Sequence, residues 1–374
     1  MKAKDLILFY KQDSIIGTIA ERIKPCKPFH LQLKGLVGSL DAVIATAIGE
    51  LVQQNHLFVL QDKEEAIYFL NDLQNLINNK SIHSDNGNMK EVDSPEKSGS
   101  PDLQYGTGTL RSDRQLTVGK LSTVPDIYRD QLPTVLLFPD SYKRPLQFDQ
   151  ADNANMQMRV EVLTKICQVE EAGNSQLKAD KLSTVNCGSA ELTEVQLPTV
   201  LIVTYPEALA EKVINKNALK KNTFQASTGE KIDINFISEL LIDHDFEKSD
   251  FVFEAGQFAI RGGIIDIYSY AHELPYRIEL SGDEIESIRT LDPDTQLSID
   301  HVEHITITAN IQGGVVKETK ESFLNFIPAN TKLWFKDIQF TSDIIQKCAE
   351  TADNFLKKLK SKVTIEFGKQ FYFN

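Results

Sequence analysis

A chain of 374 residues with 41% hydrophobic and 25% charged residues is long enough for two or three globular domains. Its formal net charge of -13 argues against a general nucleic-acid clamp, because affinity for the phosphate backbone comes from clustered lysine and arginine. No apolar run approaches the roughly 18 residues needed to span a membrane, and the N-terminus lacks the apolar core of a signal peptide. The sequence therefore predicts a cytoplasmic protein that does not act at a membrane.

The four cysteines, Cys26, Cys167, Cys187 and Cys348, lie far apart and form no C-x-x-C pair. Zinc sites and thiol redox motifs usually place two cysteines within one short motif, so neither kind of site is indicated. The sequence predicts no metal and no cofactor for this chain.

The first 52 residues read as helix, loop and helix. An amphipathic stretch from Leu6 to Ile23 favours a helix that is interrupted at Gly17. A short β-like run beginning at Phe29, a glycine loop and an Ala- and Ile-rich helix ending at Val52 come next. A strand, a glycine loop and a helix in this order form the context in which a phosphate-binding P-loop occurs.

The glycine loop departs from the P-loop motif where that motif carries its chemistry. Residues 35–42 read GLVGSLDA, so the first glycine of G-x-x-x-x-G-K-[ST] is present but its last three residues are replaced. A carboxylate at Asp41 repels phosphates, and Ala42 has no hydroxyl with which to hold magnesium. We expect no ATP hydrolysis here. The degenerate nucleotide loop comprises Gly35, Gly38, Ser39, Asp41 and Ala42.

The following segments alternate between strand and helix. His56 to Leu60 predicts a buried strand, and Lys63 to Asn78 predicts an amphipathic helix. Thr134 to Phe138 and Thr199 to Thr204 predict two further strands. This alternation is typical of a doubly wound α/β sheet.

Two polar stretches interrupt the alternation, at about 79–131 and about 170–195. They are rich in Ser, Asp, Asn, Gly and Lys, and they cannot bury enough apolar surface to offset their ordering entropy. We expect both to be mobile insertions. Between them, Tyr142, Lys143 and Arg144 offer a stacking and charged surface for nucleic acid, but a cluster of this size is more often a solvated loop.

Beyond the last of these strands the pattern changes to antiparallel. Tyr205 to Asn217 and Phe236 to Ile242 predict helices. Gln257 to Tyr270 alternates apolar and polar residues around Arg261-Gly262-Gly263, and Tyr276 to Leu291 gives two β-rich runs joined at Ser281-Gly282-Asp283. We expect a small antiparallel sheet, with a bulge or a positive-φ residue at the glycine pair.

The same stretch, Phe253 to Ser298, resembles domain 2 of the bacterial transcription-repair coupling factors, the Mfd family. It carries F-A-x-R-G-G-I-x-D-I and then P-Y-R-I-E-L-x-G-D-E-I-E-S-I-R-T-x-D-P-x-T-Q. The excision-repair protein UvrB carries a looser version of this signature. In both relatives this domain is the docking surface for the repair protein UvrA, so the resemblance implies UvrA as a partner.

The resemblance also implies a domain organisation. Residues 1–205 are expected to form a UvrB-like, doubly wound domain 1a with the degenerate P-loop, and 206–309 an inserted α+β domain 2 with the antiparallel sheet. Residues 310–374 would return to the first domain as domain 1b. A short helix and a strand are expected within Phe323 to Asp337, and a long helix from Thr341 to Lys362.

Within domain 2, the UvrA-contacting arginines of the family fall on Arg261 and Arg277. Planar guanidinium groups suit bidentate pairing with the carboxylates of a partner. Alternatively, both arginines pair with acids of this chain such as Asp266 or Glu279. Relatives often have an aromatic residue where Ser281 stands, and its loss weakens docking in this interpretation.

These observations lead to three hypotheses. In the first, the chain is a monomeric, non-catalytic N-terminal module that recruits UvrA to lesion-stalled RNA polymerase in nucleotide excision repair. RNA polymerase, DNA, ATP and magnesium would then be bound by other domains of a complete relative. In the second, the chain is a UvrB-like ATP-dependent repair enzyme. The missing P-loop lysine and the absence of the tyrosine-rich hairpin of UvrB count against that. In the third, the chain is a structural module whose arginines are internal.

Overall fold

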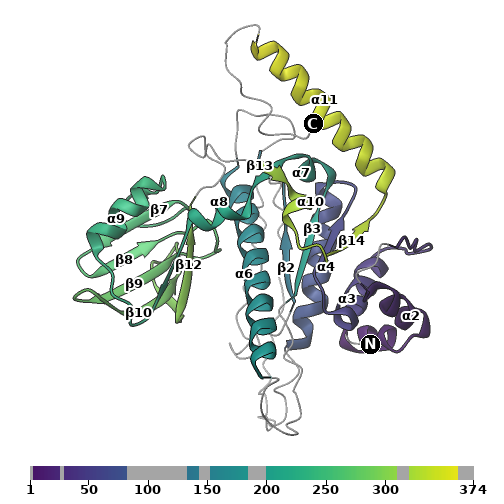
Figure 1. Cartoon of the computed structure of the whole chain (residues 1–374), viewed down its shortest axis with the longest axis horizontal. Coiled ribbons are helices and arrows are strands. Elements are labelled where there is room, and N and C mark those ends of the chain that lie inside the picture. The colour runs from purple at the N-terminus through teal and green to yellow at the C-terminus, as the bar shows by residue number, and fades with distance from the viewer. Residues whose placement is uncertain are drawn as a thin grey trace, which may run out of the picture.

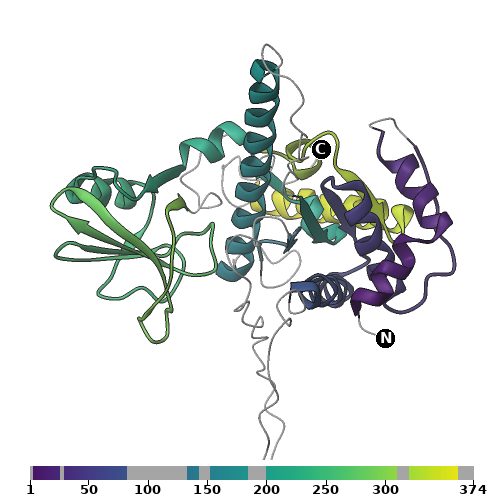
Figure 2. The ribbon, with the colours of Figure 1, turned by 90° about the horizontal axis from the view of Figure 1, so that it is seen from below.

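The computed structural model describes residues 3–25, 29–81, 133–142, 152–183, 199–309 and 320–360. Two larger sheets, each with its own hydrophobic core, organise these residues. Figures 1 and 2 show the four-stranded sheet and the N-terminal helices on one side of helix α6, and the six-stranded sheet on the other. Within the described ranges, no helix combines the length and the apolar character that crossing a membrane requires.

The first unit is built on a parallel sheet with the strand order β14-β1-β3-β2. Its strands are β1 (His56–Val59), β2 (Thr134–Leu137), β3 (Val200–Thr204) and β14 (Lys332–Phe335). Every residue of β1 and β3 is buried. Because successive side chains of a strand point to opposite faces, both faces of the sheet are covered at these strands. Helices α4 (Lys63–Ser81) and α6 (Asn153–Ser183) pack on β2 and β3. The predicted α/β class and these strands are confirmed.

Strand β14 comes from a distant part of the sequence and completes this sheet. It pairs in parallel with β1, and the indole Nε1 of Trp334 donates to Nδ1 of His56 at 2.9 Å across 278 residues of sequence. The Trp334 ring also stacks on Phe58. Helix α10 (Phe323–Phe326) precedes β14 and α11 (Ile338–Lys360) follows it, which confirms the predicted short helix, strand and long helix.

Three N-terminal helices share a small core of their own, and they are α1 (Ala3–Lys11), α2 (Ser14–Ile23) and α3 (Leu40–Val52). The predicted interruption at Gly17 is wrong, because Gly17 lies inside α2 and the break falls at Asp13. The Asp13 carboxylate accepts hydrogen bonds from the amides of Ile15 and Ile16, and so caps α2. The β-like run expected after this helix is also wrong, since residues 29–37 form no strand.

The helix expected from Tyr205 to Asn217 is wrong as well. The structure instead has α7 (Pro206–Ala210), the short strand β4 (Lys212–Ile214) and α8 (Lys216–Lys221). Strand β4 pairs antiparallel with β13 (Lys320–Ser322), and this long-range pairing overrides the local helix propensity. All three elements pack into the core of the first unit.

Helix α6 runs through the first half of the polar stretch expected at about 170–195. Glu170 pairs with Nζ of Lys216 at 2.6 Å and Glu171 with Nζ of Lys220 at 2.7 Å, which ties α6 to α8. Residues 170–183 are therefore helical, and the mobility expected for this stretch stays a prediction. Residues 184–198, like 82–132 of the other expected insertion, lie outside the described residues.

The second unit is a six-stranded sheet with the order β11-β10-β9-β8-β7-β6. Its strands are β6 (Glu247–Lys248), β7 (Gln257–Arg261), β8 (Ile264–Ile267), β9 (Tyr276–Ser281), β10 (Glu284–Leu291) and β11 (Ser298–His301). Neighbours run antiparallel except β6 and β7, which are parallel. Helix α9 (Ile234–Asp243) and the pair of β5 (Thr223–Ser227) and β12 (His304–Thr308) pack into its core. The predicted antiparallel sheet and the helix preceding it are confirmed.

Two glycine turns fix the register of this sheet. Gly262, with φ of 61°, joins β7 to β8, and Gly282, with φ of 66°, joins β9 to β10. Residues with a Cβ rarely adopt these angles. A Cβ on Gly263 would lie 3.0 Å from the carbonyl oxygen of Leu280, so this position also favours glycine. The positive-φ position predicted at the glycine pair is confirmed.

Helix α6 forms polar contacts with the second unit. Nε2 of Gln157 donates to the carbonyl oxygen of His272 at 2.5 Å, and Nε2 of Gln168 lies 3.4 Å from Oγ1 of Thr306. Glu161 lies between these two glutamines in the helix. Burial and the nearby charge of Glu273 raise the pKa of Glu161 to about 8, although Lys165 acts in the opposite direction.

Replacing Glu161 with glutamine is expected to stabilise the protein more at pH 8 than at pH 5. Between the ordinary pKa of 4.5 and about 8, the unfolded chain releases the Glu161 proton while the folded chain keeps it. Stability then falls as pH rises, by at most ~1.4 kcal/mol per pH unit, and glutamine removes this dependence. Urea unfolding at pH 5, 6.5 and 8 measures the difference. An equal effect of Glu161→Gln at all three values, or an equal trend in the exposed-site control Glu239→Gln, would contradict the assignment.

Candidate functional site

The outer face of the six-stranded sheet carries a cluster of charged residues. Phe258, Ile265 and Ile278 point into its core, so their neighbours in each strand point outward. The strand register places Asp266 opposite Arg277, and Arg277 opposite Arg289. The outward set on β7 to β10 includes Arg261, Ile264, Asp266, Arg277, Glu279, Ser287 and Arg289.

A fully buried carboxylate, Asp266, joins the two arginines predicted as site residues. Nε of Arg277 donates to Oδ1 of Asp266 at 2.7 Å, and Nη2 donates to Oδ2 at 2.9 Å. Nη2 of Arg261 donates to the same Oδ2. The hydrogen bonds to Asp266 raise the pKa of Arg277. The structure therefore brings Arg261 and Arg277 together on one anion, and the alternative pairing with Asp266 considered from the sequence does occur.

Internal pairing leaves part of each guanidinium group available. An arginine has five N–H donors. Arg261 donates to two acceptors among the described residues. They are the carboxylate of Asp266 and the carbonyl oxygen of Asp250, the latter at 2.5 Å. Arg277 also reaches the carbonyl oxygen of Gln296, at 3.3 Å. The side chain of Arg261 is 36% exposed and that of Arg277 is 16% exposed, so Asp266 orients both groups without removing them from the surface.

The third predicted residue, Ser281, lies apart from this pair. It is exposed at the end of β9, four residues beyond Arg277 and thus roughly 13 Å away along the strand. Between them, Glu279 accepts a hydrogen bond from Oγ of Ser287 at 2.8 Å and pairs with Nη2 of Arg289 at 3.4 Å. The structure shows no contact of Ser281 with the arginine pair.

The degenerate nucleotide loop has an internal partner that the sequence did not reveal. Gly35 and Gly38 adopt positive φ angles of 82° and 59° before α3 begins. Asp41 in the first turn of α3 accepts a hydrogen bond from Nζ of Lys336, at 2.9 Å, and the same ammonium group pairs with Glu65 at 3.2 Å. These two acids raise the pKa of Lys336.

The remaining residues of this loop have structural positions. Ser39 precedes α3 without a side-chain capping hydrogen bond, and Ala42 is fully buried in the core of the first unit. No strand precedes the loop within the described residues, so the expected strand, loop and helix arrangement is incomplete. One sign in the sequence that Lys336 could take part in this site is its position at the end of a predicted strand.

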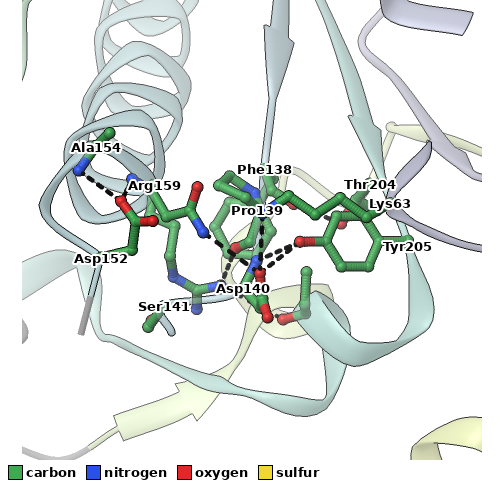
Figure 3. Close-up of polar contacts among 12 residues, drawn as sticks. Lys63, Phe138, Pro139, Asp140, Ser141, Asp152, Ala154, Arg159, Thr204 and Tyr205 are labelled. Carbon is green, nitrogen blue, oxygen red and sulfur yellow. Dashed lines mark hydrogen bonds and ion pairs between the residues drawn. The ribbon is translucent and has the colours of Figure 1, made fainter. Parts of the chain in front are cut away.

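A second polar cluster, not predicted from the sequence, lies at the carboxyl ends of β2 and β3 (Figure 3). The hydroxyl of Tyr205 donates to Oδ1 of Asp140 at 2.6 Å, and the Asp140 amide donates back to that hydroxyl at 3.0 Å. Lys63 lies 3.8 Å from the same carboxylate. Ligands of open α/β sheets usually bind at this edge. Here the side chains of the cluster bind one another.

A fully buried arginine connects this cluster to the core. Nη1 of Arg159 donates to the carbonyl oxygen of Pro139 at 2.6 Å and lies 3.5 Å from the carboxylate of Glu211. Its guanidinium carbon lies 4.2 Å from the centre of the Phe138 ring. Glu211 also accepts from the hydroxyl of Ser141 at 2.6 Å, yet burial raises the pKa of Glu211.

Comparison with known proteins finds relatives of part of the chain. Residues 224–312 match the family described as UvrB interaction domain. The transcription-repair-coupling factor of Bacillus subtilis (strain 168) is 35% identical over 133 residues, which are 35% of this chain and 11% of the relative. That of Borreliella burgdorferi is 36% identical over 101 residues, 27% of this chain and 9% of the relative. That of Staphylococcus aureus (strain USA300) is 44% identical over 80 residues, 21% and 7%. The matched stretches span about a tenth of these relatives or less.

Proposed function

We propose that this chain is a non-catalytic module that recruits UvrA, because residues 224–312 match the family described as UvrB interaction domain and part of the chain is similar to transcription-repair-coupling factors. The outer face of the six-stranded sheet is the docking surface. The observation that carries this proposal is the pair of arginines held by Asp266, which are oriented and partly exposed. A carboxylate of UvrA would accept hydrogen bonds from the guanidinium N–H groups that are not used by Asp266 and the backbone.

The same relationship supports a wider setting for this contact. In a complete protein, RNA polymerase stalled at a lesion would be handled by other domains that bind DNA, ATP and magnesium. This chain would then recruit UvrA to that site for nucleotide excision repair.

The first unit is, in this proposal, a UvrB-like doubly wound domain whose nucleotide site has been lost. The pairing of Asp41 with Lys336 supports the loss, because a phosphate would have to displace a carboxylate from its partner. The burial of Ala42 supports it too, since alanine lies in the core and has no side-chain oxygen that could hold magnesium. Measurable ATP turnover by the purified chain, abolished by a substitution at Asp41, would favour the UvrB-like enzyme instead.

The domain boundary predicted at 310 remains part of this proposal, whereas the one predicted at 206 is moved. The packing of α7, β4 and α8 with the core of the first unit favours a first boundary after residue 221. Limited proteolysis with mass spectrometry of the protected fragments would locate both boundaries.

Calorimetric titration of the chain into UvrA tests the docking surface. Arg261→Ala and Arg277→Ala are each expected to weaken binding by about 2 kcal/mol, roughly thirtyfold, because arginine is a frequent interface hot spot. Arg22→Ala is the matched control, since Arg22 is exposed on α2 in the first unit. Equal affinities of all four proteins would move the interface elsewhere. No binding by the wild type would leave the arginines as internal structure only.

A further inference from the structure

Two exposed phenylalanines lie beside the arginine pair. Phe251 is 47% exposed and Phe253 is 56% exposed, and their ring centres are 6.4 Å apart. The guanidinium carbon of Arg261 lies 4.9 Å from the centre of the Phe251 ring. A stacked arginine and two neighbouring aromatic rings on one surface is the composition of interface hot spots.

The segment that carries these rings is held in place from both sides. Val252, between them, is fully buried with Ala259 and Leu291, so its two neighbours point toward solvent. The amide of Phe253 donates to Oε1 of Gln257 at 2.9 Å. Nε2 of Gln296 donates to the carbonyl oxygen of Val252 at 3.0 Å.

The last contact links the aromatic segment to the arginine pair. The backbone carbonyl oxygen of Gln296 accepts a hydrogen bond from Arg277, and its side-chain amide donates one to Val252. One residue thus connects both parts of the surface. The rings are therefore held outward before any partner binds, which lowers the entropy that binding must remove. Neither ring belongs to a hydrophobic core of the described residues, so burial in a core does not account for them.

We propose that Phe251 and Phe253 are the apolar anchor of the docking surface. This inference rests on the proposed function and names the chemistry of the contact. Two guanidinium groups face one carboxylate, Asp266, so the pair keeps a net positive charge. The partner surface is then a protein patch with a carboxylate for Arg261 and, beside it, a shallow apolar site for the two rings.

Titration into UvrA of Phe251→Ala, Phe253→Ala and the double variant tests this anchor. Each single variant is expected to lose about tenfold in affinity and the double variant at least about thirtyfold. Phe236→Ala is the matched control, because Phe236 is 63% exposed on α9, which packs in the core on the opposite face of the sheet. Its affinity is expected to stay within about twofold of the wild type.

Salt dependence separates the anchor from the arginines. Losing a ring removes apolar contact, so the double variant should keep the salt dependence of the wild type, whereas Arg261→Ala should reduce it. If Arg261→Ala weakens binding and the phenylalanine variants do not, the anchor is overturned and the proposed function stands. If the wild type itself does not bind, the proposed function fails first. Concentration-dependent dimers in sedimentation that disappear in the double variant would assign the rings to a second copy of the chain and also overturn the anchor.

Discussion

Replacing Arg159 with alanine is expected to destabilise the first unit by about 3–5 kcal/mol, because it leaves a buried charge without its partner. Arg159 is fully buried between β2, α6 and α7, and it is the cation nearest to the buried Glu211 among the contacts described above. Its removal also opens a cavity against the Phe138 ring and frees the carbonyl oxygen of Pro139.

Urea unfolding followed by tryptophan fluorescence measures this loss. Trp334 is the only tryptophan of the chain and lies in β14, so its emission reports on the first unit. The double variant Arg159→Ala with Glu211→Gln should recover part of the loss, because the unpaired charge is gone and only the cavity remains. A loss below about 1 kcal/mol for Arg159→Ala, comparable to that of an exposed ion pair, would show that water reaches Glu211.

Replacing Asp266 with asparagine is expected to cost about 2–3 kcal/mol and to weaken UvrA binding as strongly as removing an arginine. The neutral amide offers one acceptor oxygen in place of the two that bind Arg261 and Arg277. The two guanidinium groups then lie side by side without a compensating charge. Their exposure keeps the cost below that of a fully buried pair, since water solvates both in part.

Hydrogen exchange of the β7 to β9 amides, together with titration into UvrA, measures both effects. Glu279→Gln is the matched control on the same face. Glu279 is 31% exposed and its partner Arg289 is 33% exposed, so losing this pair should cost no more than about 1 kcal/mol. If Asp266→Asn is as mild as Glu279→Gln in both measurements, Asp266 does not organise the surface.

Local patterns predicted the second unit well. The alternation from Gln257 onward identified its hairpins, and Gly262 and Gly282 marked turns whose φ angles few other residues adopt. Once the strands and turns were fixed, the pleat placed Arg261 and Arg277 on one face. The sequence offered Asp266 and Glu279 as internal partners, and only the register shows that Asp266 takes both arginines.

Long-range contacts account for what the sequence did not predict. The helix expected after Tyr205 gave way to β4 because β13 pairs with it from about a hundred residues further along the chain. Helix α6 continues past residue 170 because lysines of α8 bind its acids. Arg159 lies 52 residues before Glu211, and a polar residue inside an apolar helical pattern gives no sign of which acid it will meet.

The pairing of β14 with β1 has a consequence for the order in which the chain folds during its synthesis. All residues of the second unit leave the ribosome before residues 332–335 do, so its sheet can form while the first unit still lacks a strand. Until β14 arrives, β1 is an edge strand with unpaired amide and carbonyl groups, open to pairing with another chain. A ribosome that pauses between the two events therefore leaves β1 of the nascent first unit open to aggregation.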